Sequence, residues 1–574
     1  MELRGIPVCS GRVCEQSYLL AAVPEFDSMA TSTQSREERG EIVREALAQI
    51  MAETEEARAR YEAQHEQENA ALMEVQMVML EDGVFLDGIE EKLDEGFAPH
   101  AAVLQSGMAL EEMLRNIGDE YMAARAEDTH DLTFRLACKI CGLPYPDLSG
   151  LHQPRIVVAG ELLPSMLLSA DLSCVKGLVL ATGTKTSHVS ILASGLQIPA
   201  IVGCGDVSAI ADGEQIYVDA DAGTVCFQMS EAERSTCLHA VEEYQKTLQR
   251  LKTFTDKPFQ SSDGIESRLM VNITDPVELD HLGECKIAGV GLLRSEFLYM
   301  ERNALPSEEE QYLVYARAAK QMGERTLTIR TLDIGGDKDA RCLMLEKEAN
   351  PFMGYRAIRI CLDRPELILT QLRAILRAAC HGSIQIMFPM VALPEELVRM
   401  RGFVEQAAQQ LQQEGVAFRK DVPIGMMVEV PSAVIMLDQL LPLVDFVSIG
   451  SNDLVQYTFA ADRLNTKLGY LNNFLHPAAL RLIKHTIDMA DKYGKECSLC
   501  GEMAGDPMGM AVLAMLGLKK FSVGPSKLLR CKEKMSLLDV GAMRKQQYDL
   551  LNSQSAQRVE EYMRDILPAE YFLA

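Results

Sequence analysis

The carboxyl-terminal half of the chain alternates between short apolar segments and helical sequence, and this rhythm restricts the fold more than any other feature. Alternation of strand and helix repeated eight times is typical of a closed (β/α)₈ barrel, in which the chemistry lies at the carboxyl ends of the strands. The sequence therefore predicts a TIM barrel with a site at its mouth. The eight predicted strands are Leu269–Thr274, Gly289–Phe297, Leu327–Asp333, Ile384–Met390, Ile424–Glu429, Phe446–Ser451, Cys497–Glu502 and Lys519–Gly524.

Charged and reactive side chains gather where these strands are predicted to end. Arg294 and Arg330, with Arg463 beyond the sixth strand, are guanidiniums that suit a small substrate carrying a phosphate and a carboxylate, and Lys338 adds a cation. Other residues at these ends are Glu296, Asp333, Asn452 and Glu502. The convergence of charge at the ends of buried strands favours an active site over a rim of structural ion pairs.

Two further residue types at these strand ends predict specific chemistry. Glu429 and Asp453 supply the hard oxygen ligands that Mg²⁺ requires. Cys500 offers a thiol that can give a proton to a carbanion or an enolate. For Cys500 alone, a role as a small buried hydrophobe is the stronger interpretation.

A second candidate site lies in the segment Thr182–Ser190. The apolar run before it is typical of a buried strand, and Val189, Ile191, Leu192 and Leu196 are spaced as one face of a short helix. Thr186 or Ser187 is a suitable N-cap, which places His188 in the first helical turn, where backbone amides favour an anion. A neutral imidazole there can accept a phosphoryl group, and Lys185 adds a charge for its oxygens. The alternative is an incidental histidine beside a capping cluster.

The remaining sequence predicts three further parts. Gly5–Ala22 and the segments that follow Arg155 have β character, and we assign residues 1–32 and 144–228 to one small α/β domain. Residues 33–143 form an inserted all-helical domain that begins at the capping box Ser35–Glu38. Residues 229–260 are a linker helix, and residues 261–574 are the barrel domain.

Composition restricts the classes of function. A net charge of −27 argues against non-specific nucleic-acid binding. There is no apolar run long enough to insert into a membrane and no signal-peptide pattern, so we expect a cytoplasmic protein. Fifteen scattered cysteines suit reduced thiols better than disulfides. Two CxxC pairs, Cys138/Cys141 and Cys497/Cys500, lack the context of zinc or redox sites.

The two candidate sites together suit a phosphorylated enol. The histidine would take the phosphoryl group, and the enolate left behind would take a proton. With these residues in place, the chain resembles enzyme I of the bacterial phosphoenolpyruvate-dependent sugar phosphotransferase system over essentially its whole length. The resemblance is carried by Lys185–His188, Gly291–Leu298, Arg330–Lys338, Asn350–Arg359, Ile386–Met390, Gly450–Thr458 and Cys500–Gly505.

The resemblance implies a role for each matching residue. It implies that His188 is phosphorylated, that Glu429 and Asp453 hold Mg²⁺, and that Cys500 protonates the enolate to pyruvate. The phosphoenolpyruvate ligands would be Arg294, Arg330, Arg463, Asn452, Lys338 and Arg356. It further implies that the helical insertion docks the histidine phosphocarrier HPr, that the barrel forms a homodimer, and that the histidine domain swings between barrel and partner.

Three positions differ from the family pattern. Lys185 stands where an arginine is usual, Leu163 stands where a threonine hydroxyl supports the active histidine, and Gln76 stands where a histidine is frequent. Two other functions stay open at this stage. One is an HPr-binding regulatory paralogue with weakened catalysis. The other is a dikinase-like enzyme, which would need a nucleotide-binding domain for which no glycine-rich phosphate loop is found.

Overall fold

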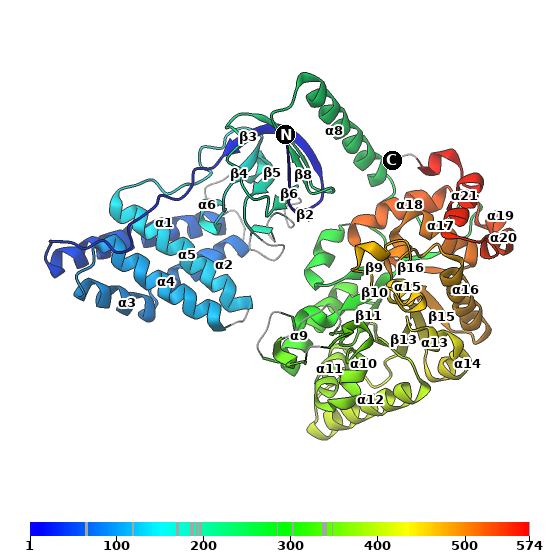
Figure 1. Ribbon diagram of the computed structural model, residues 1–574. Coiled ribbons are helices and arrows are strands. Elements are labelled where there is room, and N and C mark those ends of the chain that lie inside the picture. Colours follow the sequence, from blue (N-terminus) through cyan, green and yellow to red (C-terminus); the bar gives the residue numbers. More distant parts are fainter. Residues whose placement is uncertain are drawn as a thin grey trace. The chain divides into compact units, whose positions relative to one another are not determined.

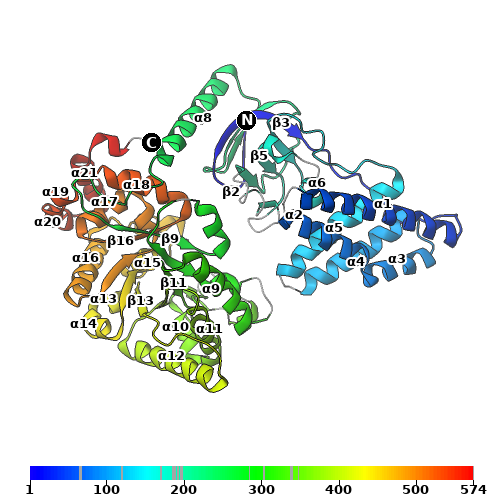
Figure 2. The ribbon, with the colours of Figure 1, turned by 180° about the vertical axis from the view of Figure 1, so that it is seen from behind.

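The computed structural model describes most of the chain, which divides into two compact units, Met1–Lys246 and Thr247–Ala574. The described residues are 1–63, 67–117, 120–167, 171–183, 189–190, 193, 198–283, 285–300, 304–335, 341–346 and 348–572. Two residues with predicted roles, His188 and Lys338, lie outside them. Figures 1 and 2 show the described elements from opposite sides.

The first unit contains an eight-stranded sheet of order β1-β8-β7-β3-β4-β5-β6-β2. Its central strands β3 to β6 run parallel, and the pairs β2/β6, β3/β7, β7/β8 and β1/β8 are antiparallel. Both faces are apolar, since Val157 belongs to one core cluster and Ile156 and Val158 to another. The strands are β1 Glu2–Arg4, β2 Ile6–Cys9, β3 Arg12–Leu19, β4 Arg155–Ala159, β5 Val175–Leu180, β6 Ala200–Val202, β7 Gln215–Asp219 and β8 Thr224–Cys226; α6 spans Pro164–Leu167.

A bundle of helices is inserted between β3 and β4, as the sequence predicts (Figure 1). Its helices are α1 Arg36–Ala63, α2 Gln67–Leu80, α3 Gly83–Asp94, α4 Pro99–Ile117 and α5 Glu120–Cys141. The predicted capping box begins α1: the Ser35 amide donates to Glu38 Oε2 at 2.9 Å, and the Glu38 amide donates to Ser35 Oγ at 3.3 Å. These two bonds satisfy amides that the first helical turn leaves without partners.

The predicted linker helix is α8, Glu231–Lys252. Ser230 precedes it, and its amide donates to Glu233 Oε2 at 2.8 Å. The last residues of α8, from Thr247 on, and the turn that follows belong to the second unit. Within that unit Arg250 pairs at 2.7 Å with Glu533 of helix α18 (Leu528–Ser536), and Lys532 donates to the carbonyl of Thr255 at 2.7 Å.

The second unit is the predicted TIM barrel. Its eight strands close in the order β9 to β16, and every neighbouring pair is parallel. The helices lie outside the strands (Figures 1 and 2). The strands are β9 Arg268–Ile273, β10 Gly289–Arg294, β11 Thr326–Arg330, β12 Ile384–Phe388, β13 Ile424–Val428, β14 Phe446–Ile449, β15 Glu496–Leu499 and β16 Lys520–Val523.

The barrel helices follow the strands in sequence. They are α9 Glu308–Met322, α10 Ile358–Asp363, α11 Pro365–Ala378, α12 Pro394–Glu414, α13 Pro431–Ile435, α14 Leu437–Leu440, α15 Ser451–Phe459, α16 Pro477–Lys492, α17 Pro507–Leu516, α18, α19 Val540–Arg544, α20 Gln547–Leu551 and α21 Ala556–Ile566.

All eight barrel strands end earlier than the sequence predicts. Glu296 and Asp333 lie in the connections beyond β10 and β11, and Ser451 begins helix α15. Residues just beyond the last ladder hydrogen bonds are also buried, so the apolar pattern in the sequence continues past the ends of the strands. The predicted site residues therefore lie on the connections that follow the strands, where side chains can converge above the barrel.

Candidate active site

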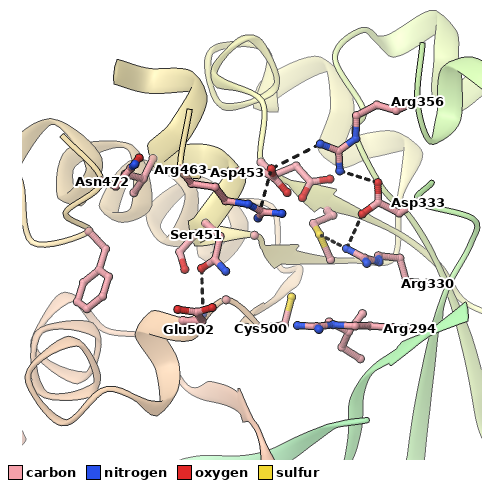
Figure 3. Close-up of a pocket in the computed structure, with 18 of the residues that line it drawn as sticks. Arg294, Arg330, Asp333, Arg356, Ser451, Asp453, Arg463, Asn472, Cys500 and Glu502 are labelled. Atoms are coloured by element: carbon pink, nitrogen blue, oxygen red, sulfur yellow. Dashed lines mark hydrogen bonds and ion pairs between the residues drawn. The ribbon is translucent and has the colours of Figure 1, made fainter. Parts of the chain in front are cut away.

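A cavity of about 590 Å³ lies at the carboxyl ends of the barrel strands (Figure 3). Arg294 and Arg330 are the last residues of β10 and β11, while Glu429 and Cys500 directly follow β13 and β15. Closure of the barrel brings these ends together although they are far apart in sequence. Eight of the ten predicted site residues line the cavity: Arg294, Arg330, Arg356, Glu429, Asn452, Asp453, Arg463 and Cys500.

One wall of the cavity is a buried network of two guanidiniums and two carboxylates. Arg330 pairs with Glu296 and, at 3.0 Å, with Asp333, whose other oxygen lies 2.8 Å from Arg356. Burial alone would lower the pKa of Arg330, but the carboxylates of Glu296 and Asp333 outweigh it and raise that pKa. The guanidiniums are therefore held charged and in fixed positions.

Two guanidiniums also face Asp453 from different sides. Its Oδ1 atom lies 3.6 Å from Arg356 and 3.9 Å from Arg463. Arg463 lies 5.4 Å from the ring centroid of Phe352, a cation–π distance. Tyr457 accepts from Arg356 at 3.1 Å and donates to the Phe352 carbonyl at 2.5 Å. It therefore connects Arg356 with Phe352, the residue whose ring Arg463 contacts.

Arg294 differs from the other guanidiniums because it is exposed. It has no ion-pair partner among the residues that the structure describes. Figure 3 shows its guanidinium directed toward Cys500. This cation is available to a ligand without any protein ion pair having to break.

Three carboxylates lie close together beside these cations. Burial, together with the negative charges of Asp453 and Asp333, raises the pKa of Glu429 to about 8. Glu429 Oε1 accepts from the Met390 amide at 2.6 Å. Gly450 makes room for this side chain, since a Cβ atom there would lie 2.7 Å from Glu429 Oε2.

The carboxylates of Glu429 and Asp453 fit a divalent cation. Asp453 Oδ1 is buried and makes no hydrogen bond within the described part of the chain. The repulsion that raises the pKa of Glu429 is what a bound cation would relieve. Two hard carboxylates facing substrate-binding space are typical of a Mg²⁺ site that completes its coordination with water and substrate oxygens.

Cys500 fits both interpretations that the sequence left open, a small buried hydrophobe and a proton donor. Its thiol is buried in an apolar cluster with Leu292, Met387, Met427 and Phe446, and it also lines the cavity. Burial raises the pKa of Cys500, while Ser448 and the guanidinium of Arg330 lower it. The thiol is therefore protonated at neutral pH and faces bound ligand from an apolar floor.

A smaller cavity of about 260 Å³ adjoins the first. It shares Arg294, Cys500, Gly501 and Glu502 with the larger cavity and extends between the ends of β9 and β16. Asn272 borders this side and donates to the Cys500 carbonyl at 2.9 Å. The segment that carries the thiol therefore separates two open spaces.

Sequence reasoning did not identify Tyr457 or Ser451 as parts of the site. Tyr457 lies four residues after Asp453 on α15, so helical spacing places both side chains on one face. Ser451 lines the cavity and packs over Gly501, where a Cβ atom would approach its Oγ atom to 2.0 Å. The i, i+4 spacing was a usable signal for Tyr457, whereas the contact between Ser451 and Gly501 has no local signal.

Two of the three positions that differ from the family pattern lie in the described part of the chain. Leu163 is buried in the same core cluster as Val189 and Ala193, so its side chain contributes to packing. Gln76 is buried on α2. Lys185 lies outside the described residues.

The two CxxC pairs do not form a metal site in the described part of the chain. All fifteen cysteines are free, and neither pair belongs to a described group of three or more His, Cys, Asp or Glu side chains that could hold a metal. None of the described helices has the length and apolar character that a membrane span requires.

Comparisons with known proteins agree with this geometry. Residues 248–540 match the family described as PEP-utilising enzyme, PEP-binding domain. Residues 151–223 match the mobile domain and residues 4–125 the N-terminal region of PEP-utilising enzymes.

Curated relatives match almost the whole chain. The phosphoenolpyruvate-protein phosphotransferase of Geobacillus stearothermophilus is 35% identical over 93% of this chain and 93% of its own length. The proteins of the same name from Bacillus subtilis and Staphylococcus carnosus are each 34% identical, over 98% and 95% of this chain and 99% and 95% of their own lengths. The chain belongs to the phosphoenolpyruvate-protein phosphotransferase family of PEP-utilising enzymes.

Proposed function

We propose that the protein transfers the phosphoryl group of phosphoenolpyruvate to its own His188 and then to the phosphocarrier HPr, releasing pyruvate as the first step of a sugar phosphotransferase system. The observation that carries the proposal is the barrel cavity, where guanidiniums, two carboxylates suited to a cation and a thiol converge. A substrate with a phosphate, a carboxylate and a carbon that must gain a proton uses all three kinds of group.

The guanidiniums bind the two anionic groups of phosphoenolpyruvate. Arg294, exposed and without a described ion-pair partner, meets the ligand directly, while Arg330 and Arg356 are fixed by Asp333. Arg463, Asn452 and Lys338 complete the predicted set. Because these positive charges are already in place, they stabilise the charge that spreads over the phosphoryl oxygens during transfer.

Glu429 and Asp453 hold Mg²⁺ in this proposal. When bound, the ion neutralises negative charge on substrate oxygens. The protein residues orient the substrate beside it: the guanidiniums fix its oxygens, and Leu292 and Met427 form the apolar floor beneath its carbon skeleton.

Cys500 gives the proton that converts the enolate to pyruvate. Its S–H bond breaks, the new C–H bond forms at the terminal carbon of the enolate, and the electron pair stays on sulfur. The raised pKa of the thiol keeps the proton in place until the enolate is formed.

The amino-terminal unit carries the phosphoryl group onward. We assign residues 1–32 and 144–228 to the phosphohistidine domain, residues 33–143 to HPr docking, residues 229–260 to the linker and residues 261–574 to substrate binding and homodimer formation. Fifteen free cysteines support a cytoplasmic location.

The central experiment is phosphorylation with labelled phosphoenolpyruvate, Mg²⁺ and purified HPr. We expect an acid-labile, base-stable label that is absent from His188→Ala and passes from the wild-type protein to HPr. Retention of the label in His188→Ala refutes the residue assignment. Absence of label and of pyruvate in the wild type, with HPr still bound, favours a regulatory paralogue instead.

A second experiment separates phosphoryl transfer from protonation. In Cys500→Ala we expect a first-turnover label on His188 at close to the wild-type rate but slow formation of pyruvate. Unchanged pyruvate formation means that the proton comes from another group.

A further inference from the structure

Gln371 is a polar side chain within the apolar layer outside the barrel strands. It lies on α11, and its neighbours on that helix, Leu367, Ile368, Leu372 and Ile375, belong to the main hydrophobic core. The Gln371 side chain is itself fully buried. A buried amide is costly unless its hydrogen-bonding groups are paired, so the partners of Gln371 indicate its role.

The amide of Gln371 connects the segments that follow β10 and β11. Its Nε2 atom donates to Ser295 Oγ at 3.0 Å, and its Oε1 atom accepts from the Leu332 amide at 2.9 Å. Ser295 Oγ in turn donates to the carbonyl of Arg330 at 2.8 Å. The nitrogen also donates to the hydroxyl of Tyr315 at 3.0 Å. These bonds pair the amide oxygen and both hydrogens of the amide nitrogen.

The two connected segments carry two guanidiniums of the cavity. Arg294 directly precedes Ser295, and Arg330 lies two residues before Leu332. The two arginines are partners in the register of β10 and β11. Figure 3 shows both guanidiniums extending into the cavity. A side chain that links the two segments therefore acts on the separation of these two charges.

The ladder between β10 and β11 does not fix this separation by itself. Its register shifts between Val290 and Leu293, directly before the first arginine. On the other strand, the amide of Leu332 donates to Gln371 instead of to a strand carbonyl. A link that lies beyond this irregularity can hold the two guanidiniums in one arrangement, as a rigid supporting group does for a binding site.

Gln311 on the neighbouring helix α9 is the matched comparison. It is also buried, and the hydroxyl of Tyr315 lies between the two amides, since it donates to Gln311 Oε1 at 3.4 Å. The other described partners of Gln311 are the Tyr299 hydroxyl and the Pro306 carbonyl, each at 3.2 Å. Both glutamines are therefore buried and paired, but within the described residues only Gln371 reaches the segment after β11.

We propose that Gln371 is a positioning residue that fixes the separation of Arg294 and Arg330, so that the two guanidiniums match a ligand with two anionic groups. It acts through Ser295 on one side and Leu332 on the other, and it is not among the residues that line the cavity. The inference rests on the proposed function of this cavity as the phosphoenolpyruvate site. It adds a group outside the cavity that favours a ligand with two anionic groups over a ligand with one.

The test measures ligand binding in the full-length protein carrying His188→Ala, which under the proposed function binds phosphoenolpyruvate without accepting its phosphoryl group. Gln371→Met and Gln311→Met are compared in this background, because each removes one buried amide. Calorimetry gives Kd for phosphoenolpyruvate in the presence of Mg²⁺, and displacement of phosphoenolpyruvate gives Kd for inorganic phosphate.

We expect Gln371→Met to raise Kd for phosphoenolpyruvate about ten-fold, because one of its two anionic groups loses a well-aligned guanidinium. Kd for phosphate should change less than about two-fold, since a single anionic group does not need a fixed separation. Gln311→Met should leave both constants within about two-fold of the reference protein. Urea unfolding should show similar losses of stability in the two variants, so stability alone does not explain the difference in binding.

Ser295→Ala tests the same link from the other side. It removes the hydroxyl between Gln371 and the Arg330 carbonyl and should raise Kd for phosphoenolpyruvate about three-fold. The double variant should bind no more weakly than Gln371→Met alone, because both changes break one link. Ser295→Ala also serves as the test variant if Gln371→Met does not fold.

The outcomes separate the inference from the proposed function. Equal Kd for phosphoenolpyruvate in Gln371→Met and Gln311→Met overturns the inference, and so does an equal loss of affinity for phosphate and phosphoenolpyruvate. If the His188→Ala protein itself binds no phosphoenolpyruvate, the proposed function fails and the role of Gln371 fails with it.

Discussion

The two units treat buried charge in opposite ways. In the barrel, Arg330 and Arg356 are buried against Glu296 and Asp333, so that charge is matched by charge. In the amino-terminal unit, the described groups that donate hydrogen bonds to the fully buried Asp131 are neutral, and the one positive charge that acts on it, Arg135, is a weaker influence. Asp131 accepts from the Tyr145 hydroxyl at 2.6 Å, from the Ser165 amide at 2.8 Å and from the Ser165 hydroxyl.

This difference distinguishes a charged network suited to ligand binding from a neutral hydrogen-bonded group that joins parts of the fold, which we call the neutral anchor. Buried ion pairs contribute little net stability, because the loss of hydration offsets their attraction, so the barrel network is better explained by anion binding than by folding. Burial raises the pKa of Asp131 against its hydrogen bonds, which favours the neutral acid. Asp131 on α5 thereby joins the helical insertion to the segments on either side of β4 with hydrogen bonds.

The largest expected effect is in the barrel. In Arg356→Met we expect stability to fall by about 3–5 kcal/mol, because Asp333 is left buried with a reduced counter-charge. We expect kcat/KM for phosphoenolpyruvate to fall at least about 100-fold. Urea unfolding of the barrel and a pyruvate assay measure the two effects. The control Arg268→Met breaks an exposed pair with Glu496 and should cost less than about 1 kcal/mol; equal losses would remove the distinction between site and surface.

A second expected effect is the pH dependence of the metal-free barrel. The folded-state pKa of Glu429, raised to about 8 by burial and by Asp453 and Asp333, lies above its unfolded value. The folded state therefore binds more protons, and stability falls as pH rises from about 5 through 8. Thermal unfolding in chelator should show this slope in the wild type and a flatter profile in Glu429→Gln. A slope unchanged in the variant would assign it to another group.

A smaller loss is expected at the neutral anchor. Tyr145→Phe removes one donor to Asp131 and should reduce the stability of the amino-terminal unit by about 1 kcal/mol. Asp131→Ala strands the Tyr145 and Ser165 hydroxyls and should cost about 2–3 kcal/mol. Calorimetry of the full chain separates these losses from the barrel transition. A loss in Tyr145→Phe as large as that in Arg356→Met would contradict the comparison.

The smallest effect is expected at the surface of the bundle. Glu53 pairs with Arg135 at 3.1 Å and with Lys139, and all three side chains are partly exposed. In Glu53→Gln we expect a loss below about 1 kcal/mol that shrinks further in high salt. Chemical unfolding at two salt concentrations is the measurement. A large loss of stability that does not depend on salt would show that these ion pairs behave like the buried pairs of the barrel.

The sequence could predict the barrel and most of its cavity because the information is local and repeated. Each strand is marked by an apolar run, and many site residues stand at its end or just after it. Closure of the barrel alone therefore brings Arg294, Glu429 and Cys500 together. The partner of Arg356 was not predictable in the same way. Its pairing with Asp333 depends on the path of the connection after β11, which no periodicity records.

The sheet of the first unit shows the same limit. The strands from β2 to β7 had recognisable β character, but β1 and β8 were not predicted. The pairing of β1 with β8 and of β2 with β6 joins the two ends of the unit's chain. Such pairings depend on which edges are left open after the parallel core has formed.

In the proposed reaction, in which Cys500 gives the proton, the small cavity beside Cys500 affects where the hydrogen in the product comes from. A ligand that fills the larger cavity leaves the sulfur bordered on its other side by a space lined by Thr274, Glu278 and Lys527. Solvent hydrogen can therefore reach the thiol while the ligand is still bound, instead of only between turnovers. In deuterated water the new methyl hydrogen should accordingly carry the isotope of the surrounding solvent from the first turnover onward.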